Sequence, residues 1–189
     1  RGYPDSEIGL LLAARGLGNW TAFLMIVPMS RLIPRVSIAL GLAMQAFSAW
    51  SMAQFDINVT PFGIAWTSWL QGFGQSITFT PMTVMAFATL PKHQVTEGSA
   101  IFTLMRNFGS SLFISLAVLT LIRSTSINYA RMTEFITPFR EMLTLLPGTW
   151  NPETTSGLLR LSNEIQRQAA MIGYINAFYL FAACAAVGI

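Results

Sequence analysis

Five apolar segments are the feature of this chain that most restricts how it can fold. Each is long enough to cross a bilayer as a helix, which takes about 20 mostly apolar residues. The segments are residues 8–27, 36–55, 62–90, 99–122 and 169–189. Of 11 Lys and Arg and 8 Asp and Glu, only Arg15 and Arg106 lie inside them. The pattern predicts an all-α polytopic membrane protein.

The composition excludes several other classes. Charged residues make up 10% of the chain, against about 25% in soluble domains, and the mean hydropathy is +0.53. The net charge is +3, but the basic residues form no runs with interleaved aromatics, so we expect no nucleic-acid partner. The single cysteine, Cys184, has no disulfide partner. No metal-ligand cluster, catalytic triad or nucleophile elbow is present, so we expect neither a metal site nor an enzyme.

Charges in the short connections predict an orientation. Arg31 and Arg35 flank the first connection, and Lys92 and His93 occupy the third. Short loops rich in Lys and Arg face the cytoplasm, so we expect these two connections inside and the long connection 123–168 outside. Its last part, 156–168, is predicted to be a polar helix that leads into the fifth segment. Because the chain begins with Arg and ends in apolar residues, we also expect the gene product to continue at both ends.

The two arginines inside apolar segments are the first candidates for function. An arginine in hydrocarbon costs at least ~2.5–3.5 kcal/mol on insertion scales and usually faces a cavity, a partner or the bundle interior. Arg15 and Arg106 are therefore candidates for a gate pair or a substrate contact. The alternative is that each extends its stem to the nearer membrane surface.

The third segment carries the second group of candidates. Gln71, Gln75 and Thr78 recur at helical spacing and so share one face, and Trp69 lies beside them. We interpret this face as a substrate path that water can reach. The alternative is hydrogen bonding between helices. In the same segment Gly72 and Gly74 permit close helix approach and Pro81 can kink the helix, whereas none of the five segments contains an acidic residue.

Several passages, taken in order, resemble a known family. They are Gly-Leu-Leu-Leu-Ala-Ala-Arg-Gly-Leu-Gly at 9–18 with Pro-Met-Ser-Arg-Leu-Ile-Pro-Arg at 28–35, Leu-Gln-Gly-Phe-Gly at 70–74 with Pro81, and Gly-Ser-Ala at 98–100 with Arg-Asn-Phe-Gly-Ser-Ser at 106–111. The segment 167–178 is also typical. The chain resembles the C-terminal half of the major facilitator superfamily, in its fourteen-helix drug:proton antiporter branch of the EmrB/QacA type. The resemblance covers nearly the whole chain.

The resemblance implies a function and partners. Residues 1–189 would form a partial C-terminal bundle of five transmembrane helices, helices ten to fourteen, in the bacterial inner membrane. Arg15, Arg106 and Asn107 would lie on helices at the interface of two halves that rock around a midplane site. The transporter would export amphiphilic small molecules without a cofactor, driven by the proton gradient. Its partners would be the bilayer, the missing N-terminal half, and a periplasmic adaptor with an outer-membrane channel.

The sequence also departs from the family pattern. The cytoplasmic turn usually reads Gly-Arg-Leu-x-Asp-Arg, but here Arg31 and Arg35 flank Leu-Ile-Pro with no acid between them. An acidic residue is frequent near Asn176 in the family and is missing here, which weakens a proton role for the last segment. Two alternatives stay open: an exporter of a siderophore or metabolite with the same fold, and a structural or enzymatic membrane subunit.

Overall fold

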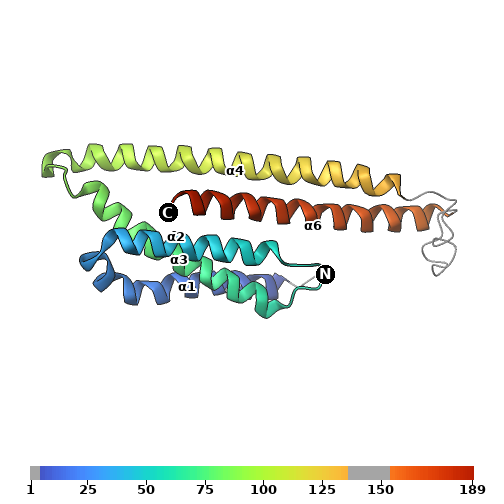
Figure 1. The fold of residues 1–189 in the computed structure, drawn as a ribbon, viewed down its shortest axis with the longest axis horizontal. Helices are drawn as coiled ribbons and strands as arrows, with labels where there is room; N and C mark the ends of the chain where they lie inside the picture. The colour runs from blue at the N-terminus through green and yellow to red at the C-terminus, as the bar shows by residue number, and fades with distance from the viewer. Residues whose placement is uncertain (1–4, 136–153) are drawn as a thin grey trace. The chain divides into compact units, whose positions relative to one another are not determined.

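The structure, a computed structural model, describes residues 5–135 and 154–189, and within these ranges it leaves out the side chains of residues 5, 7 and 27–32. Every secondary-structure element in the described part is a helix (Figure 1). In chain order the elements are α1 (Asp5–Leu32), α2 (Pro34–Ala53), α3 (Pro61–Phe87), the short 3-10 helix η1 (Lys92–Gln94), α4 (Val95–Glu134) and α6 (Thr155–Val187).

The chain divides into two compact units. The first comprises Arg1–Ser115 and Phe178–Ile189, and the second comprises Leu116–Ala177. Helices α4 and α6 each contribute residues to both units.

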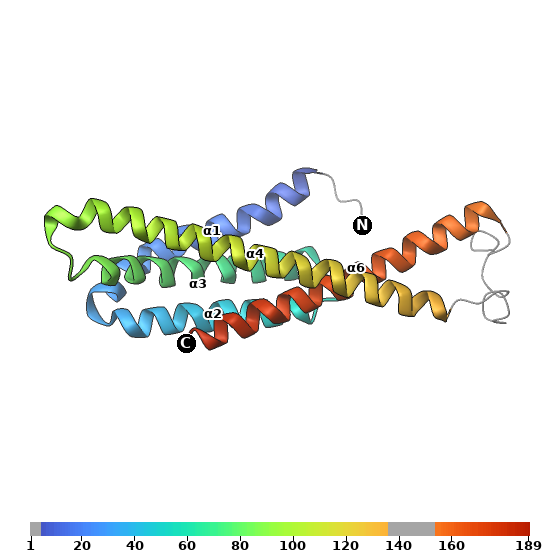
Figure 2. The ribbon, with the colours of Figure 1, turned by 90° about the horizontal axis from the view of Figure 1, so that it is seen from above.

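In the first unit, α3 contacts both α1 and α2, whereas α1 and α2 barely touch each other (Figures 1 and 2). Glycines make both contacts close. A Cβ at Gly72 would collide with the Arg15 carbonyl oxygen of α1, and one at Gly74 would lie 2.8 Å from the Gly41 carbonyl oxygen of α2. Two helical residues at i and i+2 lie about 160° apart, so the Gly-Phe-Gly sequence allows α3 to approach a different helix on each side.

In the second unit, α4 and α6 lie side by side and antiparallel. Asn176 Nδ2 donates to Ser124 Oγ (2.6 Å), and the hydroxyls of Tyr129 and Ser162 are 3.1 Å apart. Later residues of α4 thus meet earlier residues of α6. A Cβ at Gly173 would lie 2.9 Å from the Leu121 carbonyl oxygen, so here too a glycine brings the helices close.

Several element bounds differ from the sequence expectation. Helix α1 continues through Pro28 to Leu32, and only Ile33 separates it from α2, where Pro34 takes the first helical position. Proline is well tolerated there because the first helical N–H has no partner within the helix. Helix α4 continues beyond Ile122 to Glu134, where a loop was expected. Helix α6, which begins at Thr155, confirms the polar helix predicted for 156–168. Both helices therefore take residues from the connection 123–168, of which 136–153 lies outside the described residues.

Four of the described helices are long and apolar enough to cross a membrane. They are Ile8–Ile26 of α1, Pro34–Ala53 of α2, Lys92–Glu134 including α4, and Thr155–Val187 of α6. Helix α3 has 27 residues and no charge, but Gln71 and Gln75 lower its hydropathy, so it does not meet the same criterion. The all-helical architecture is confirmed, whereas the five spans of a major facilitator fold stay a prediction.

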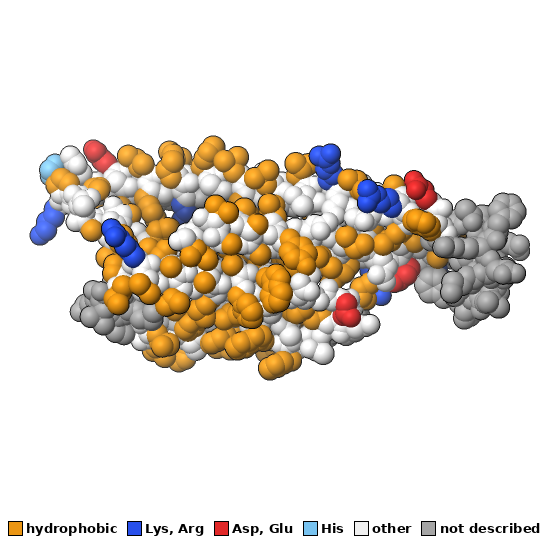
Figure 3. All heavy atoms as spheres, viewed as in Figure 1, with side chains coloured by type: hydrophobic (Ala, Val, Ile, Leu, Met, Phe, Trp, Pro, Cys, Tyr) orange, Lys and Arg blue, Asp and Glu red, His pale blue; other side chains and the backbone are white. Residues whose placement is uncertain are grey.

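Apolar side chains cover much of the surface. Figure 3 shows hydrophobic side chains over most of the visible face. Leu12 and Phe23 of α1 and Leu104 and Leu119 of α4 are more than half exposed. Soluble monomers rarely expose apolar patches larger than a few hundred Å², so these faces indicate contact with lipid or with further helices.

Candidate functional site

Arg15 on α1 reaches α3 through one strong hydrogen bond. Its Nη2 donates to Gln75 Oε1 at 2.7 Å. The backbones approach closely beneath this bond, because Gly72 faces the Arg15 carbonyl without a Cβ. A guanidinium donor shortens and strengthens such a bond relative to a neutral one. The predicted candidates Arg15 and Gln75 are therefore partners.

Thr78 lies on the α2 side of the same helix. Its hydroxyl donates to the Gly74 carbonyl (2.9 Å) and accepts from Gln45 Nε2 (3.1 Å). A Cβ at Gly41 would also collide with the Thr78 hydroxyl. The shared polar face of α3 thus links two neighbours, α1 through Gln75 and α2 through Thr78. Gln71, one turn before Gln75, is half-buried.

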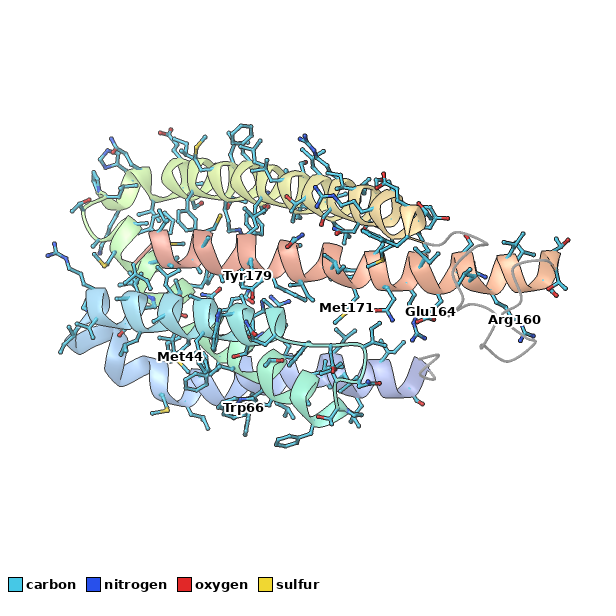
Figure 4. The ribbon with its side chains drawn as sticks, turned by 45° about the vertical axis from the view of Figure 1, so that its right-hand side comes forward. Met44, Trp66, Arg160, Glu164, Met171 and Tyr179 are labelled. Carbon is cyan, nitrogen blue, oxygen red and sulfur yellow. The ribbon has the colours of Figure 1, made fainter. Side chains whose placement is uncertain are left out.

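Trp69 belongs to a different face of α3. Its ring stacks between Trp66 (centroids 5.4 Å apart) and Phe73 (5.2 Å), as an aromatic row along the helix; Figure 4 labels Trp66. Helical spacing places Trp69 about 160° from Gln71. The sequence grouped Trp69 with the glutamines, but the three-dimensional arrangement separates them.

Arg106 on α4 meets α3 one turn beyond Gln75. Its guanidinium carbon lies 5.5 Å from the centroid of the Phe79 ring, within cation–π range. Gln75 and Phe79 are four residues apart and so lie on one face. The two arginines, far apart in sequence, therefore contact successive turns of the same helix. Asn107 is exposed, and its carbonyl accepts from the Ser110 hydroxyl (2.9 Å).

The two arginines of the predicted cytoplasmic turn are described unequally. Arg31 lies in the last turn of α1, and its side chain is outside the described residues. Arg35 is exposed in the first turn of α2. The position of this turn on the cytoplasmic side stays a prediction.

Several polar residues were missed at the sequence level. Gln45 bonds Thr78, and Asn19 Oδ1 accepts from the Ser76 hydroxyl at 3.1 Å. The sequence contained a signal for Asn19 and Gln45, since each is an amide side chain within a segment of mostly apolar residues. Spacing alone did not say which polar groups would meet.

A groove of about 500 Å³ between the end of α3 and the start of α4 was also missed. Phe87 and Phe102 line it and meet edge to face, 5.6 Å apart. Its only acidic lining residue is Glu97, in the first turn of α4. The part of the chain that the structure describes holds no group of three or more His, Cys, Asp or Glu placed to bind a metal.

Comparison with known proteins identifies similar transporters. The chain is 23% identical over 198 residues to the colistin resistance protein EmrB of Acinetobacter baumannii, a match that covers 92% of this chain and 38% of that protein. It is 23% identical over 138 residues to the multidrug export protein EmrB of Escherichia coli K12, which covers 70% of this chain and 27% of that protein. No family model matches the sequence, and no solved structure matches it.

These matches confirm the resemblance to EmrB proteins that the motifs indicated. The chain spans well under half the length of the relatives it matches. Together with the four helices that can cross a membrane, the similarity makes this a multi-pass membrane protein related to export proteins.

Proposed function

We propose that the chain is the C-terminal part of a bacterial inner-membrane multidrug efflux transporter with a major facilitator fold, which exports amphiphilic small molecules by proton-coupled antiport. The observation that carries this proposal is the similarity to EmrB along 92% of the chain. In this proposal α3 also crosses the membrane, which brings the number of spans in the described residues from four to five. The amide oxygen of Gln75 accepts a hydrogen bond from Arg15, which lowers the cost of this side chain in a span.

The contacts of the two arginines support a role in gating. The partners described above for Arg15 and Arg106 are neutral, an amide oxygen and an aromatic ring. Neither neutral group cancels the positive charge, which is costly in hydrocarbon. The two guanidinium groups, which contact one face of α3, would therefore attract a carboxylate from the remaining half of the protein or an acceptor group on a substrate.

Alternating access requires contacts that form in one state and break in the other. The Arg15–Gln75 and Arg106–Phe79 contacts are suited to this, because each is one interaction between two side chains that can re-form with another partner while the backbones stay packed. The apolar segments contain no acid, so the proton-coupling carboxylates would come from the remaining half. A periplasmic adaptor and an outer-membrane channel would complete the export route.

The test uses the full-length protein in proteoliposomes with a panel of fluorescent amphiphilic dyes. An imposed proton gradient should drive dye transport, and a protonophore should abolish it. Transport that continues unchanged after the gradient is collapsed would refute proton coupling. The absence of transport for every dye, by a monodisperse protein, would refute multidrug export.

Arg106→Ala tests the gating role within this function. Because the variant removes one of the two guanidinium groups that contact α3, we expect transport to fall at least ten-fold while membrane abundance stays normal. Arg160→Ala on α6, far along the chain from both contacts, is the matched control and should transport normally. Unchanged transport by Arg106→Ala at equal abundance would exclude that role.

A further inference from the structure

A groove lined by two arginines lies within the second unit. It has a volume of about 450 Å³, and α4 supplies seven of its lining residues, including Arg123 and Arg131, while α6 supplies Asn176. All of these residues belong to the second unit. The proposed transport path does not use them.

The lining of the groove is suited to an anion. It holds two guanidinium groups and no carboxylate. Arg123 and Arg131 are eight residues apart, about 12 Å along the helix and about 80° around it. Their long side chains can therefore converge on a ligand seated near Ile127, between them. Arginine is well matched to phosphate, because its planar guanidinium donates two parallel hydrogen bonds to two oxygens.

A neutral donor in the groove adds to this match. Ser124 Oγ accepts from Asn176 Nδ2 (2.6 Å) and from Asn128 Nδ2 (3.3 Å). A hydroxyl has two acceptor lone pairs and one proton. Asn128 Nδ2 makes its shorter bond to the Ser124 carbonyl oxygen (2.8 Å), so Asn176 is the main donor to this hydroxyl. Because the hydroxyl acts as an acceptor toward Asn176, its proton is available to donate to a bound anion.

The position of the groove along α4 favours a lipid over a soluble anion. Residues 99–122 form the proposed span, about 36 Å of helix at 1.5 Å per residue, which covers a hydrocarbon core of about 30 Å. Arg123 is the first charge after it and so lies at the level of the head groups. Leu116, Leu119 and Ile122 are more than half exposed on α4, and acyl chains can lie along them.

We propose that this groove binds the phosphate of an anionic phospholipid at the outer surface of the membrane. Arg123 and Arg131 hold the phosphodiester, Ser124 donates to it, and the acyl chains follow the apolar surface of α4. The inference rests on the proposed span 99–122 and goes beyond the transport function. Basic pockets between membrane helices bind anionic head groups by the same chemistry.

The test titrates the full-length protein in detergent with dioleoyl phosphatidylglycerol, dioleoyl phosphatidylcholine or inorganic phosphate, and counts bound molecules by native mass spectrometry. The wild-type protein should bind phosphatidylglycerol at least ten-fold more tightly than phosphatidylcholine, which has the same chains. Equal binding of both lipids would overturn the proposal. Inorganic phosphate binding as tightly as the lipid would show that the groove takes a soluble anion instead.

The double variant R123Q/R131Q should lose at least ten-fold in affinity for phosphatidylglycerol. The matched control is R160Q/R167Q, which removes the same charge from α6 outside the groove; Arg160 is labelled in Figure 4. An equal loss in both variants would show attraction by net charge only and would overturn the site. If R123Q/R131Q does not fold, the preference of the wild-type protein for phosphatidylglycerol over phosphatidylcholine decides whether the groove binds an anionic lipid. Because lipid is counted without transport, failure of this site and failure of the efflux function are separate results.

Discussion

Arg15 and Gln75 form the most specific contact of the candidate site. A bond between a guanidinium and an amide oxygen is worth about 1.5–3 kcal/mol, enough to favour one arrangement of α1 and α3 without making it permanent. A carboxylate in place of the amide would turn the contact into an ion pair, whose attraction in a low-dielectric surrounding is much stronger. In the proposed gating role, a neutral partner would let this contact open more readily than an ion pair.

Gln75→Glu should accordingly slow transport. If opening must break the contact with Arg15, each additional 1.4 kcal/mol of pairing slows it about ten-fold, and we expect at least that loss in the dye-transport rate at normal abundance. Gln54→Glu is the control, because Gln54 donates to the Tyr179 hydroxyl (3.0 Å) away from Arg15. A Gln75→Glu variant with a wild-type rate would show that this contact does not open during transport.

Glycines set how closely the helices of the first unit pack. Gly18 faces α3, where a Cβ would collide with the Trp69 carbonyl oxygen and lie 2.9 Å from the Phe73 amide nitrogen. Gly16, two residues earlier on α1, has open space around it. In lipid, such close backbone approach supplies much of the packing, because no hydrophobic force draws helices together.

Substitution of Gly18 tests this close packing, and substitution of Gly16 is the matched control. Both Gly18→Ala and Gly16→Ala gain about 1 kcal/mol of helix propensity, but only Gly18→Ala overpacks a contact, at a cost of about 1–3 kcal/mol. The melting temperature in detergent should therefore fall for Gly18→Ala relative to Gly16→Ala. Equal melting temperatures would mean that α1 and α3 are not as close in the membrane as described here.

Segment composition predicted the existence of each helix but not its length. Apolar runs mark where a helix is embedded, whereas a helix continues for as long as its backbone hydrogen bonds do. At about 1.5 Å per residue, the 40 residues of α4 measure about 60 Å, twice a hydrocarbon core. Residues 123–134 are helical, although their polarity indicated a loop, because the backbone hydrogen bonds of α4 continue past the end of the apolar run.

For the molecule as a whole, the charges of the short connections predict an orientation in the membrane that can be tested directly. In a Cys184→Ala background, a cysteine at His93 should react with a membrane-impermeant maleimide only from the cytoplasmic side. A cysteine at Ser126, which is exposed on α4, should react only from outside. The opposite labelling pattern would reverse the orientation and move the phospholipid groove to the inner leaflet.

The amino-acid pattern was sufficient for the helical membrane class and for the existence of the helices, because both depend on local properties: the length of an apolar run and its period. It also grouped Gln71, Gln75 and Thr78 correctly, because spacing defines the faces of a helix. Spacing does not say which neighbour a face meets. Only the folded chain shows that Gln75 binds Arg15 and that Arg15 and Arg106 meet successive turns of α3. These pairings depend on which helices the glycines allow to approach, and that is a property of the whole packing.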